Sequence, residues 1–410
     1  MPTQTVDPDR MLDDLDHLRR IGGQGSGVAR RAFSDADITA RRWLAGQMAA
    51  AGLEVTVDAC GNVFGLPPGD GPCLLVGSHS DTQPLGGWLD GIWGVACGLE
   101  LARAAVASGG PRIAVVSFQD EEGRFGRLTG SAVWSGAMSL AQADACTDQD
   151  ADGPDPITWA EARRRVTEIG PTGTVAPDRF VAFLEPHIEQ GPVLDDARQV
   201  VGVVEAIVGV RQWSLRLEGE ANHAGTTPMD RRRDALQGFV ACAAALNDTL
   251  AGLAGPRTVW TMGRLVAEPN ASSIVPGAAT FTVQMRDADA GLLDRMAQAT
   301  VDLAQEVAQA RGLRLTASEG LSVEPVAMDA RLRHALEAAA EACLPGRWRR
   351  MPSGALHDAS NVARVLPTAM IFAPSIGGIS HNPAEDTRRE DLALALQTLA
   401  DAAVRVSNRV

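Results

Sequence analysis

Two short polar segments of this chain carry the residue types that metal-assisted hydrolysis requires. The first, GSHSDTQPLGGWLDG, spans residues 77–91, and the second, FQDEEGRF, spans residues 118–125. Each follows an apolar run that reads as a buried strand, so their loops should converge over one edge of a sheet. Together they supply imidazole and carboxylate ligands with a spare carboxylate beside them. The side chains concerned are His79, Asp81, Asp90, Glu121 and Glu122.

The positions of these side chains indicate different roles. Asp81 lies two residues after His79 on the same side of an extended segment, where it can accept the second imidazole N–H; the alternative is a simple turn aspartate. Asp90 follows a Gly-Gly turn near the start of a helix, a position suited to bridging two cations. Adjacent extended residues point in opposite directions, so one of Glu121 and Glu122 can bind metal while the other faces the attacking water. Two solvated surface glutamates are the alternative.

Histidines supply the remaining candidates for a site. Five of the seven lie in segments with polar or glycine-rich neighbours: His79, His187, His223, His357 and His381. Their occurrence together with acidic residues at predicted strand ends favours a shared site. The other two, His17 and His334, lie on arginine-flanked helical stretches, and we interpret them as solvated or structurally satisfied side chains.

Composition restricts the classes of partner. The chain has 410 residues, of which 45% are hydrophobic and 21% charged, which is typical of a globular protein with two domains. Its net charge of −14 leaves no basic face for nucleic acid or an anionic membrane surface, and no apolar run has the length of a membrane span. We therefore expect a small-molecule substrate.

Absent residue types exclude several kinds of chemistry. The sequence contains no lysine, so all 37 basic residues are arginines, and Schiff-base catalysis, a Walker phosphate loop and a carboxylated-lysine metal bridge are excluded. The last exclusion removes the barrel-type metal amidohydrolases. Six cysteines occur without a C-x-x-C pair, which predicts reduced thiols. Because residues 1–20 also lack a basic segment followed by an apolar one, we expect a cytoplasmic protein.

The coarse pattern of elements predicts an α/β fold, a mixed-sheet catalytic domain with an inserted α+β domain. Continuous apolar runs at residues 73–77, 113–118, 180–185 and 368–373 predict strands buried on both faces, with helices between them. From residue 208 the pattern changes to alternating strands at 211–219, 258–266 and 279–286, interleaved with helices at 233–251 and 290–310. This β-α-β-β-α-β order is that of a ferredoxin-like sandwich. The predicted domains are 1–207 with 326–410, and the insert 208–325.

Seven ordered motifs carry a resemblance to a known family over nearly the whole chain. They are GSHSDTQPLGGWLDGIWGV, SFQDEEGRF, LEPHIEQGPVLD, ANHAGTTPM, NASSIVPG, SGALHDA and GISHNPAE. The set resembles the amidase/carbamoylase branch of the dinuclear M20-type metallopeptidase family. That branch includes N-carbamoyl-L-amino-acid hydrolases, bacterial β-ureidopropionases and allantoate amidohydrolases.

The resemblance implies a dinuclear metal site and a general base. One divalent ion would be held by His79, Asp90 and His187, and a second by Asp90, Glu122 and His381, so that Asp90 bridges the two. Glu121 would be the general base. Imidazole and carboxylate ligands suit two Zn²⁺ or Mn²⁺ ions per subunit, with Co²⁺ or Ni²⁺ as alternatives.

The resemblance also implies residues that hold substrate. Arg286 would clamp a carboxylate, assisted by Gln190 and Asn270, and His223 would stabilise the oxyanion, often from the partner subunit of a homodimer formed through the insert. Arg211 is either a further site residue or a strand-edge surface arginine. Leu356 stands before His357 where the family usually has glycine, so substrate preference or the local backbone should differ there.

The implied activity is hydrolysis of a carbamoyl (ureido) C–N bond on a small carboxylate-bearing substrate. An N-carbamoyl-L-amino acid is the first choice, followed by allantoate and then N-carbamoyl-β-alanine. Discrimination among the three lies in the shape of the pocket around a shared carboxylate clamp. An aminopeptidase or N-acyl amino-acid deacylase is the competing hydrolase, and the histidine of EPHIEQGP disfavours it. A metal- or ligand-binding protein without activity is the non-enzyme alternative, and Glu121 disfavours it, because a binder has no use for a base.

Overall fold

The computed structural model describes residues 5–149 and 156–407 and divides into two compact units. The larger unit is Met1–Glu205 with Met328–Val410, and the smaller is Ala206–Ala327. At both points where the chain passes from one unit to the other, the boundary lies two residues from the predicted one.

A nine-stranded mixed sheet forms the centre of the larger unit. Its middle strands run parallel, in the order β17 (Thr368–Ala373), β7 (Phe180–Ile188), β5 (Cys73–His79) and β6 (Ile113–Phe118). Every residue of β5, β6 and β17 is buried, which confirms the prediction of strands covered on both faces. The remaining strands are β4 (Val63–Leu66), β3 (Glu54–Val57), β8 (Val201–Ile207), β16 (Trp348–Ser353) and the two-residue β15 (Val326–Ala327), whose residues belong to the smaller unit.

Helices pack against this sheet and hold its loops. α3 (Ile92–Ser108) packs on β5 and β6, and α10 (Ala330–Cys343) and α12 (Arg389–Ser407) pack on β17. α1 (Pro8–Arg20) packs on α3, and α2 (Asp35–Ala50) packs on β3 and β4. The predicted cap of α2 is present, because the Ser34 hydroxyl accepts the Asp37 N–H at 3.2 Å.

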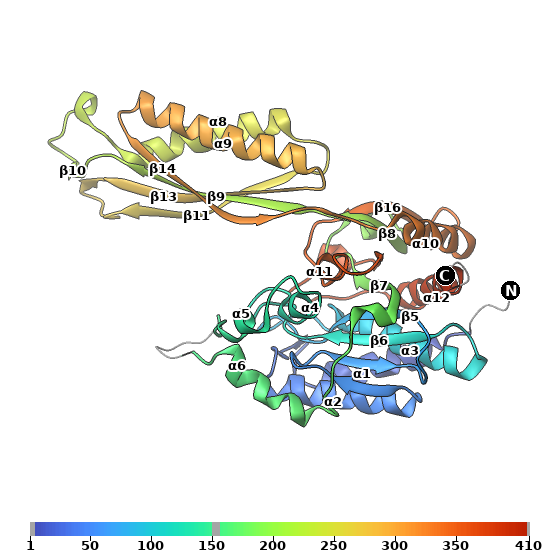
Figure 1. Cartoon of the computed structure of the whole chain (residues 1–410). Helices are drawn as coiled ribbons and strands as arrows, with labels where there is room; N and C mark the ends of the chain where they lie inside the picture. Colours follow the sequence, from blue (N-terminus) through green and yellow to red (C-terminus); the bar gives the residue numbers. More distant parts are fainter. Residues whose placement is uncertain (1–4, 150–155, 408–410) are drawn as a thin grey trace. The chain divides into compact units, whose positions relative to one another are not determined.

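The smaller unit is a four-stranded antiparallel sheet covered by two helices (Figure 1). The strand order is β11-β13-β9-β14 and the chain order is β-α-β-β-α-β, so the predicted ferredoxin-like topology is confirmed. Apolar residues of both helices and the sheet form one core, including Leu215, Phe281, Met285, Leu293 and Met296. The elements are β9 (Gly209–Glu218), α8 (Ala235–Leu253), β11 (Val259–Glu268), β13 (Ala278–Asp287), α9 (Ala290–Ala310) and β14 (Arg314–Val323).

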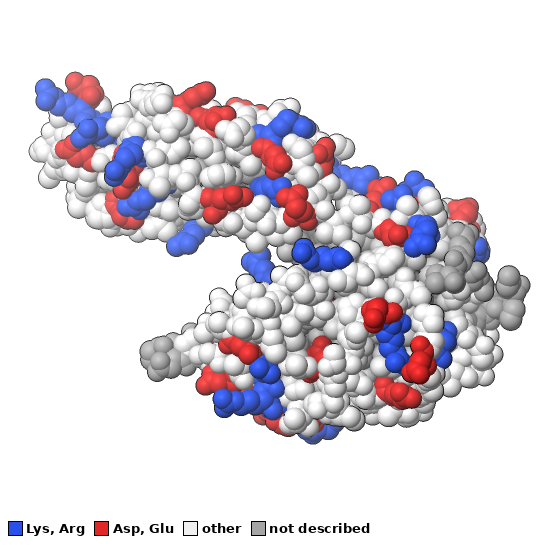
Figure 2. Space-filling view, viewed as in Figure 1, with Lys and Arg blue, Asp and Glu red and all other residues white. Residues whose placement is uncertain are grey.

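Two surface properties bear on partners. On the face drawn in Figure 2, arginines and acidic residues are interspersed over the described residues. Among those residues one helix, α8, is long and apolar enough to cross a membrane by length and composition. A single helix of this kind is weak evidence for a span. Of its apolar window 22% is buried, and α8 packs Cys242, Leu246 and Leu250 against its sheet.

Candidate metal centre

The parallel strands bring the candidate residues to one edge of the large sheet. His79 is the last residue of β5, and Glu121 and Glu122 follow the end of β6. His187 lies one residue before the end of β7, and His381 follows β17. Because parallel strands present their carboxyl ends at the same edge, residues far apart in sequence meet there.

One group of possible ligand atoms consists of His79, Asp90 and His187, which lie within 4.8 Å of one another. The Nδ1 atoms of His79 and His187 are 3.1 and 2.9 Å from the backbone carbonyl oxygens of Asp81 and Ile188, so each ring directs its Nε2 lone pair toward the group. His187 Nε2 is 3.2 Å from Asp90 Oδ1, and neither buried atom has a hydrogen-bond partner among the described residues. A cation would satisfy both atoms.

A second group consists of Asp90, Glu122 and His381. His381 Nε2 is 3.2 Å from Asp90 Oδ2 and 3.4 Å from Glu122 Oε2. The two oxygens of the Asp90 carboxylate therefore face different groups, Oδ1 toward the first and Oδ2 toward the second. This is the geometry of a bridging carboxylate, and the residues present suit two divalent cations.

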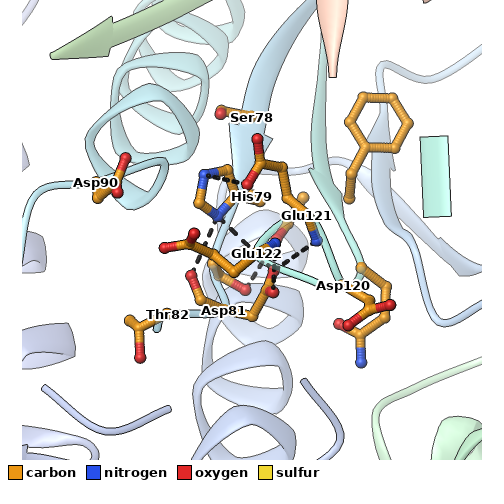
Figure 3. Close-up of polar contacts among 12 residues, drawn as sticks. Ser78, His79, Asp81, Thr82, Asp90, Asp120, Glu121 and Glu122 are labelled. Atoms are coloured by element: carbon orange, nitrogen blue, oxygen red, sulfur yellow. Dashed lines mark hydrogen bonds and ion pairs between the residues drawn. The ribbon is translucent and has the colours of Figure 1, made fainter. Parts of the chain in front are cut away.

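Gly91, the residue after Asp90, leaves room for the backbone to lie close against the His79 imidazole. A Cβ atom at Gly91 would lie 2.3 Å from His79 Nε2, and the backbone there has a φ of 64°. Only glycine meets both requirements without strain. Figure 3 shows Asp90 beside the first turn of α3, across from the His79 imidazole.

Glu121 lies beside the first group but is not one of its members. Its Oε2 atom is 3.6 Å from His79 Nε2, and its side chain is directed toward that imidazole (Figure 3). The Asp81 carboxylate accepts the backbone N–H groups of Glu121 and Glu122 at 3.4 and 3.2 Å. This differs from the predicted role of Asp81: its backbone carbonyl contacts His79 Nδ1, whereas its carboxylate, 3.7 Å from that atom, holds the glutamate loop.

Burial and like charge perturb the titration of this cluster. Desolvation, then the charges of Glu122, Asp358, Asp90 and Asp81, raise the pKa of Glu121 well above its usual value. Desolvation followed by Asp90 does the same to the pKa of Glu122. Burial lowers the pKa of His79 to about 3, so its imidazole is neutral, as a metal ligand must be. Bound cations would offset this concentration of negative charge.

Two predicted substrate residues of the larger unit lie at the cluster. Gln190 Nε2 is 3.0 Å from Asp90 Oδ2 and 3.2 Å from His381 Nε2. The buried His357 ring packs 4.4 Å from the His187 ring, and its Nε2 is 2.8 Å from Ser353 Oγ. Leu356 is partly buried and is not among the described residues with positive φ, so its backbone conformation does not require glycine.

The smaller unit carries His223, Asn270 and Arg286 at its two opposite ends. His223 belongs to β10 (Asn222–His223), which pairs with β12 (Ile274–Val275) beyond the far end of β13 (Figure 1). Asn270 lies in the adjoining loop, with a φ of 57°. Arg286 is at the other end of β13, about 27 Å from Ala278 at 3.4 Å per residue. A small molecule bound to Arg286 of one chain therefore lies out of reach of His223 and Asn270 of that chain.

The hydrogen bonds that His223 makes with its own loop determine which ring nitrogen carries the proton in the neutral imidazole. Its Nδ1 atom accepts the backbone N–H groups of Gly225 and Thr226 at 3.0 and 3.1 Å. In the neutral ring the proton is then on Nε2, and the residue is exposed. The Nε2–H group is available to donate to an oxygen atom of a ligand.

The sequence allows two roles for Arg211, a further site residue or a strand-edge surface arginine. Its side chain is 8% exposed and donates to Asp294 Oδ1 at 3.0 Å, Glu324 Oε1 at 2.6 Å and the carbonyl of Val323 at 3.0 Å. These contacts join β9, α9 and the segment after β14 inside the smaller unit. They occupy hydrogen-bonding groups of the Arg211 side chain within the smaller unit.

Two residues at the cluster were not predicted. The Gln83 amide donates to Glu122 Oε2 at 2.6 Å, and the Glu385 carboxylate accepts hydrogen bonds from the Asp90 loop. Both lie inside motifs named above. Nothing in the sequence distinguishes them from ordinary loop residues, because their role depends on side chains distant in sequence.

Comparisons with known proteins identify the family of this chain. Residues 75–405 match Peptidase family M20/M25/M40. The chain is 34% identical over 417 residues to an N-carbamoyl-L-amino-acid amidohydrolase of Rhizobium meliloti, covering 99% of this chain and 98% of that protein. It is 36% identical over 385 residues to the allantoate amidohydrolase of Escherichia coli K12, covering 91% and 92%.

Solved structures give the same result. A hydantoinase/carbamoylase family amidase from Burkholderia phymatum superimposes with a TM-score of 0.91 at 41% identity, covering all of both chains. The match extends over both units of the chain. The chain therefore belongs to Peptidase family M20/M25/M40.

Proposed function

We propose that this protein hydrolyses a carbamoyl (ureido) C–N bond of a small carboxylate-bearing substrate, with an N-carbamoyl-L-amino acid as first choice. The observation that carries the proposal is the Asp90 carboxylate, whose two oxygens face two separate ligand groups. The nearby carboxylate of Glu121 belongs to neither group and is therefore free to act as a base. Family membership and the similarity to an N-carbamoyl-L-amino-acid amidohydrolase support the substrate class.

Two divalent ions, Zn²⁺ or Mn²⁺ with Co²⁺ or Ni²⁺ as alternatives, would be held by His79, Asp90 and His187 and by Asp90, Glu122 and His381. When bound, they would supply Lewis-acid activation of water and of the ureido carbonyl.

The residues of the chain supply the remaining steps. Glu121 takes a proton from water as the water oxygen adds to the ureido carbon, and returns it to the nitrogen that leaves when the C–N bond breaks. The Nε2–H group of His223 donates to the developing oxyanion. Arg286 holds the substrate carboxylate through paired hydrogen bonds, with Gln190 and Asn270 assisting. The carbamate that results decomposes, so the products are the amino acid, ammonia and carbon dioxide.

Allantoate is the second candidate substrate. The similarity to an allantoate amidohydrolase supports it, and the same residues would attack one ureido arm of that molecule. The half-buried Leu356, in place of the usual glycine before His357, is the position where the two pockets would be expected to differ.

A substrate panel tests the proposed activity. Metal-reconstituted protein should release both ammonia and a free amino group from N-carbamoyl-L-amino acids, with the D-enantiomers as matched controls. Allantoate, N-carbamoyl-β-alanine and N-acetyl-L-amino acids complete the panel. Turnover of N-acetyl amino acids alone would replace the carbamoylase proposal with a deacylase, and binding without any turnover would favour a non-catalytic protein.

We further propose a homodimer formed through the inserted unit. If His223, Asn270 and Arg286 all hold one small substrate, they must come from different chains, because they lie at opposite ends of the unit. β11 is a suitable pairing strand, since among the described residues it has a neighbouring strand on one side only and it exposes Val259, Leu265 and Val266. The six free cysteines support the proposed cytoplasmic location.

Mixing two inactive variants tests the sharing of residues between chains. His223→Ala protein supplies Glu121, and Glu121→Gln protein supplies His223, so each heterodimer has one complete site when His223 acts across the interface. Random reassociation of equal amounts should then recover about one quarter of wild-type activity. Dimers verified by mass that stay inactive would mean that His223 and Glu121 act within one chain.

A further inference from the structure

Glu385 joins the two loops that carry Asp90 and His381. Its carboxylate is 2% exposed, and its Oε1 atom accepts the backbone N–H groups of Leu89 and Asp90, both at 3.1 Å. Its Oε2 atom accepts the Ser380 hydroxyl at 2.8 Å. One buried side chain thus ties the backbone of the bridging residue to the residue that precedes His381.

The Asp90 loop is shaped to admit this carboxylate. A Cβ atom at Gly87 would lie 2.0 Å from Glu385 Oε1, so any side chain at this position would displace the carboxylate. The φ of Gly87 is not positive, and the glycine is required by this close approach rather than by its backbone conformation. Gly87 therefore belongs to the same arrangement as Glu385.

We propose that Glu385 is a positioning residue that sets Asp90 and His381 at the separation needed to hold the second ion. The inference rests on the proposed assignment of Asp90, Glu122 and His381 as the ligands of that ion. Those three residues come from three loops, and the Asp90 carboxylate must also serve the first group. A hydrogen bond that fixes both the Asp90 backbone and the His381 loop acts on two of the three ligands at once. His79 and His187 have no contact with Glu385 among the hydrogen bonds of the described residues, so the first ion should depend on it less.

The test measures ion binding to metal-free protein rather than turnover. Mn²⁺ or Zn²⁺ is titrated against a chromophoric chelator, which gives the number of ions and a Kd for each. Wild type should bind two ions. Glu385→Ala and Gly87→Ala should each weaken the second by about 10- to 100-fold and leave the first much less changed. Glu385→Gln should recover most of the affinity, because its amide oxygen still accepts both backbone N–H groups.

Glu100 provides a matched control. It is also a buried glutamate that accepts three hydrogen bonds, from the Asp7 N–H and from Nε and Nη2 of Arg10, but it ties α1 to α3. Glu100→Ala should lower Tm and still bind two ions with wild-type affinity. If Glu385→Ala does not fold, Gly87→Ala tests the inference instead, because its added Cβ atom displaces the same carboxylate.

Several outcomes would overturn the inference. These are two wild-type affinities in Glu385→Ala or Gly87→Ala, an equal loss of the second ion in Glu100→Ala, and a Glu385→Gln variant as weak as Glu385→Ala. A wild-type protein that binds a single ion would instead contradict the two-ion assignment on which the inference rests.

Discussion

Replacing Glu121 with glutamine is expected to lower kcat by about 10²- to 10⁴-fold while both metal ions stay bound. Glutamine keeps the size of the side chain but cannot accept a proton from water. Glu121 belongs to neither ligand group, and its backbone N–H is held by the Asp81 carboxylate at 3.4 Å, so the substitution should leave the loop in place. Steady-state kinetics and metal content by mass spectrometry together check this expectation.

The surroundings of Glu121 raise the pKa of its carboxyl group when no cation is bound. Desolvation raises this pKa first, and the neighbouring carboxylate of Glu122 raises it further. Bound cations would offset these effects, so that the Glu121 carboxylate is ionised and can accept a proton from water before it passes that proton to the leaving nitrogen.

Glu122→Gln is the matched control, because it makes the same chemical change one residue along the chain. Glu122 lies in the second ligand group, 3.4 Å from His381 Nε2, so this variant should lose affinity for one ion as well as activity. Unchanged kcat in Glu121→Gln, or loss of metal equal to that of Glu122→Gln, would exclude Glu121 as the base.

Much of the candidate site could be predicted because its residues follow strands that the sequence reveals. Continuous apolar runs locate β5, β6 and β17, and parallel strands present their carboxyl ends together. His79 and Glu122 therefore had to lie near each other. The ferredoxin-like order of the smaller unit was predictable for a similar reason, since alternating strands and long helical patterns differ in period.

The remaining features depend on side-chain direction, which periodicity does not specify. Both Asp81 groups lie near His79, yet the carbonyl makes the hydrogen bond and the carboxylate turns to the glutamate loop. Arg211 faces Asp294 of α9 because of its register on β9, and its sequence neighbours do not reveal this. Glu385 acquires its role from a loop nearly three hundred residues away, as the separation of 296 residues from Leu89 shows.

Replacing Asp90 with alanine should remove both ions, whereas loss of His187 or His381 should remove one. Asp90 Oδ1 is 3.2 Å from His187 Nε2, and Oδ2 is 3.2 Å from His381 Nε2, so a single carboxylate contributes to both groups. Turnover should fall to background in all three variants. The number of ions per chain, measured after reloading with Mn²⁺ or Zn²⁺, separates the bridging residue from the ligands of one ion.

Thermal stability gives an independent measurement of how many ions each variant binds. An ion present at about 100 times its Kd stabilises the folded state by about 2.7 kcal/mol, so two ions should add about 5 kcal/mol to wild type. His187→Ala and His381→Ala should gain about half of this on adding metal, and Asp90→Ala should gain almost nothing. The control is Asp14→Ala, which breaks a partly buried ion pair with Arg103 but should keep the full gain. One ion bound to Asp90→Ala with wild-type affinity would mean that Asp90 serves a single site, and the two-ion mechanism would have to be replaced.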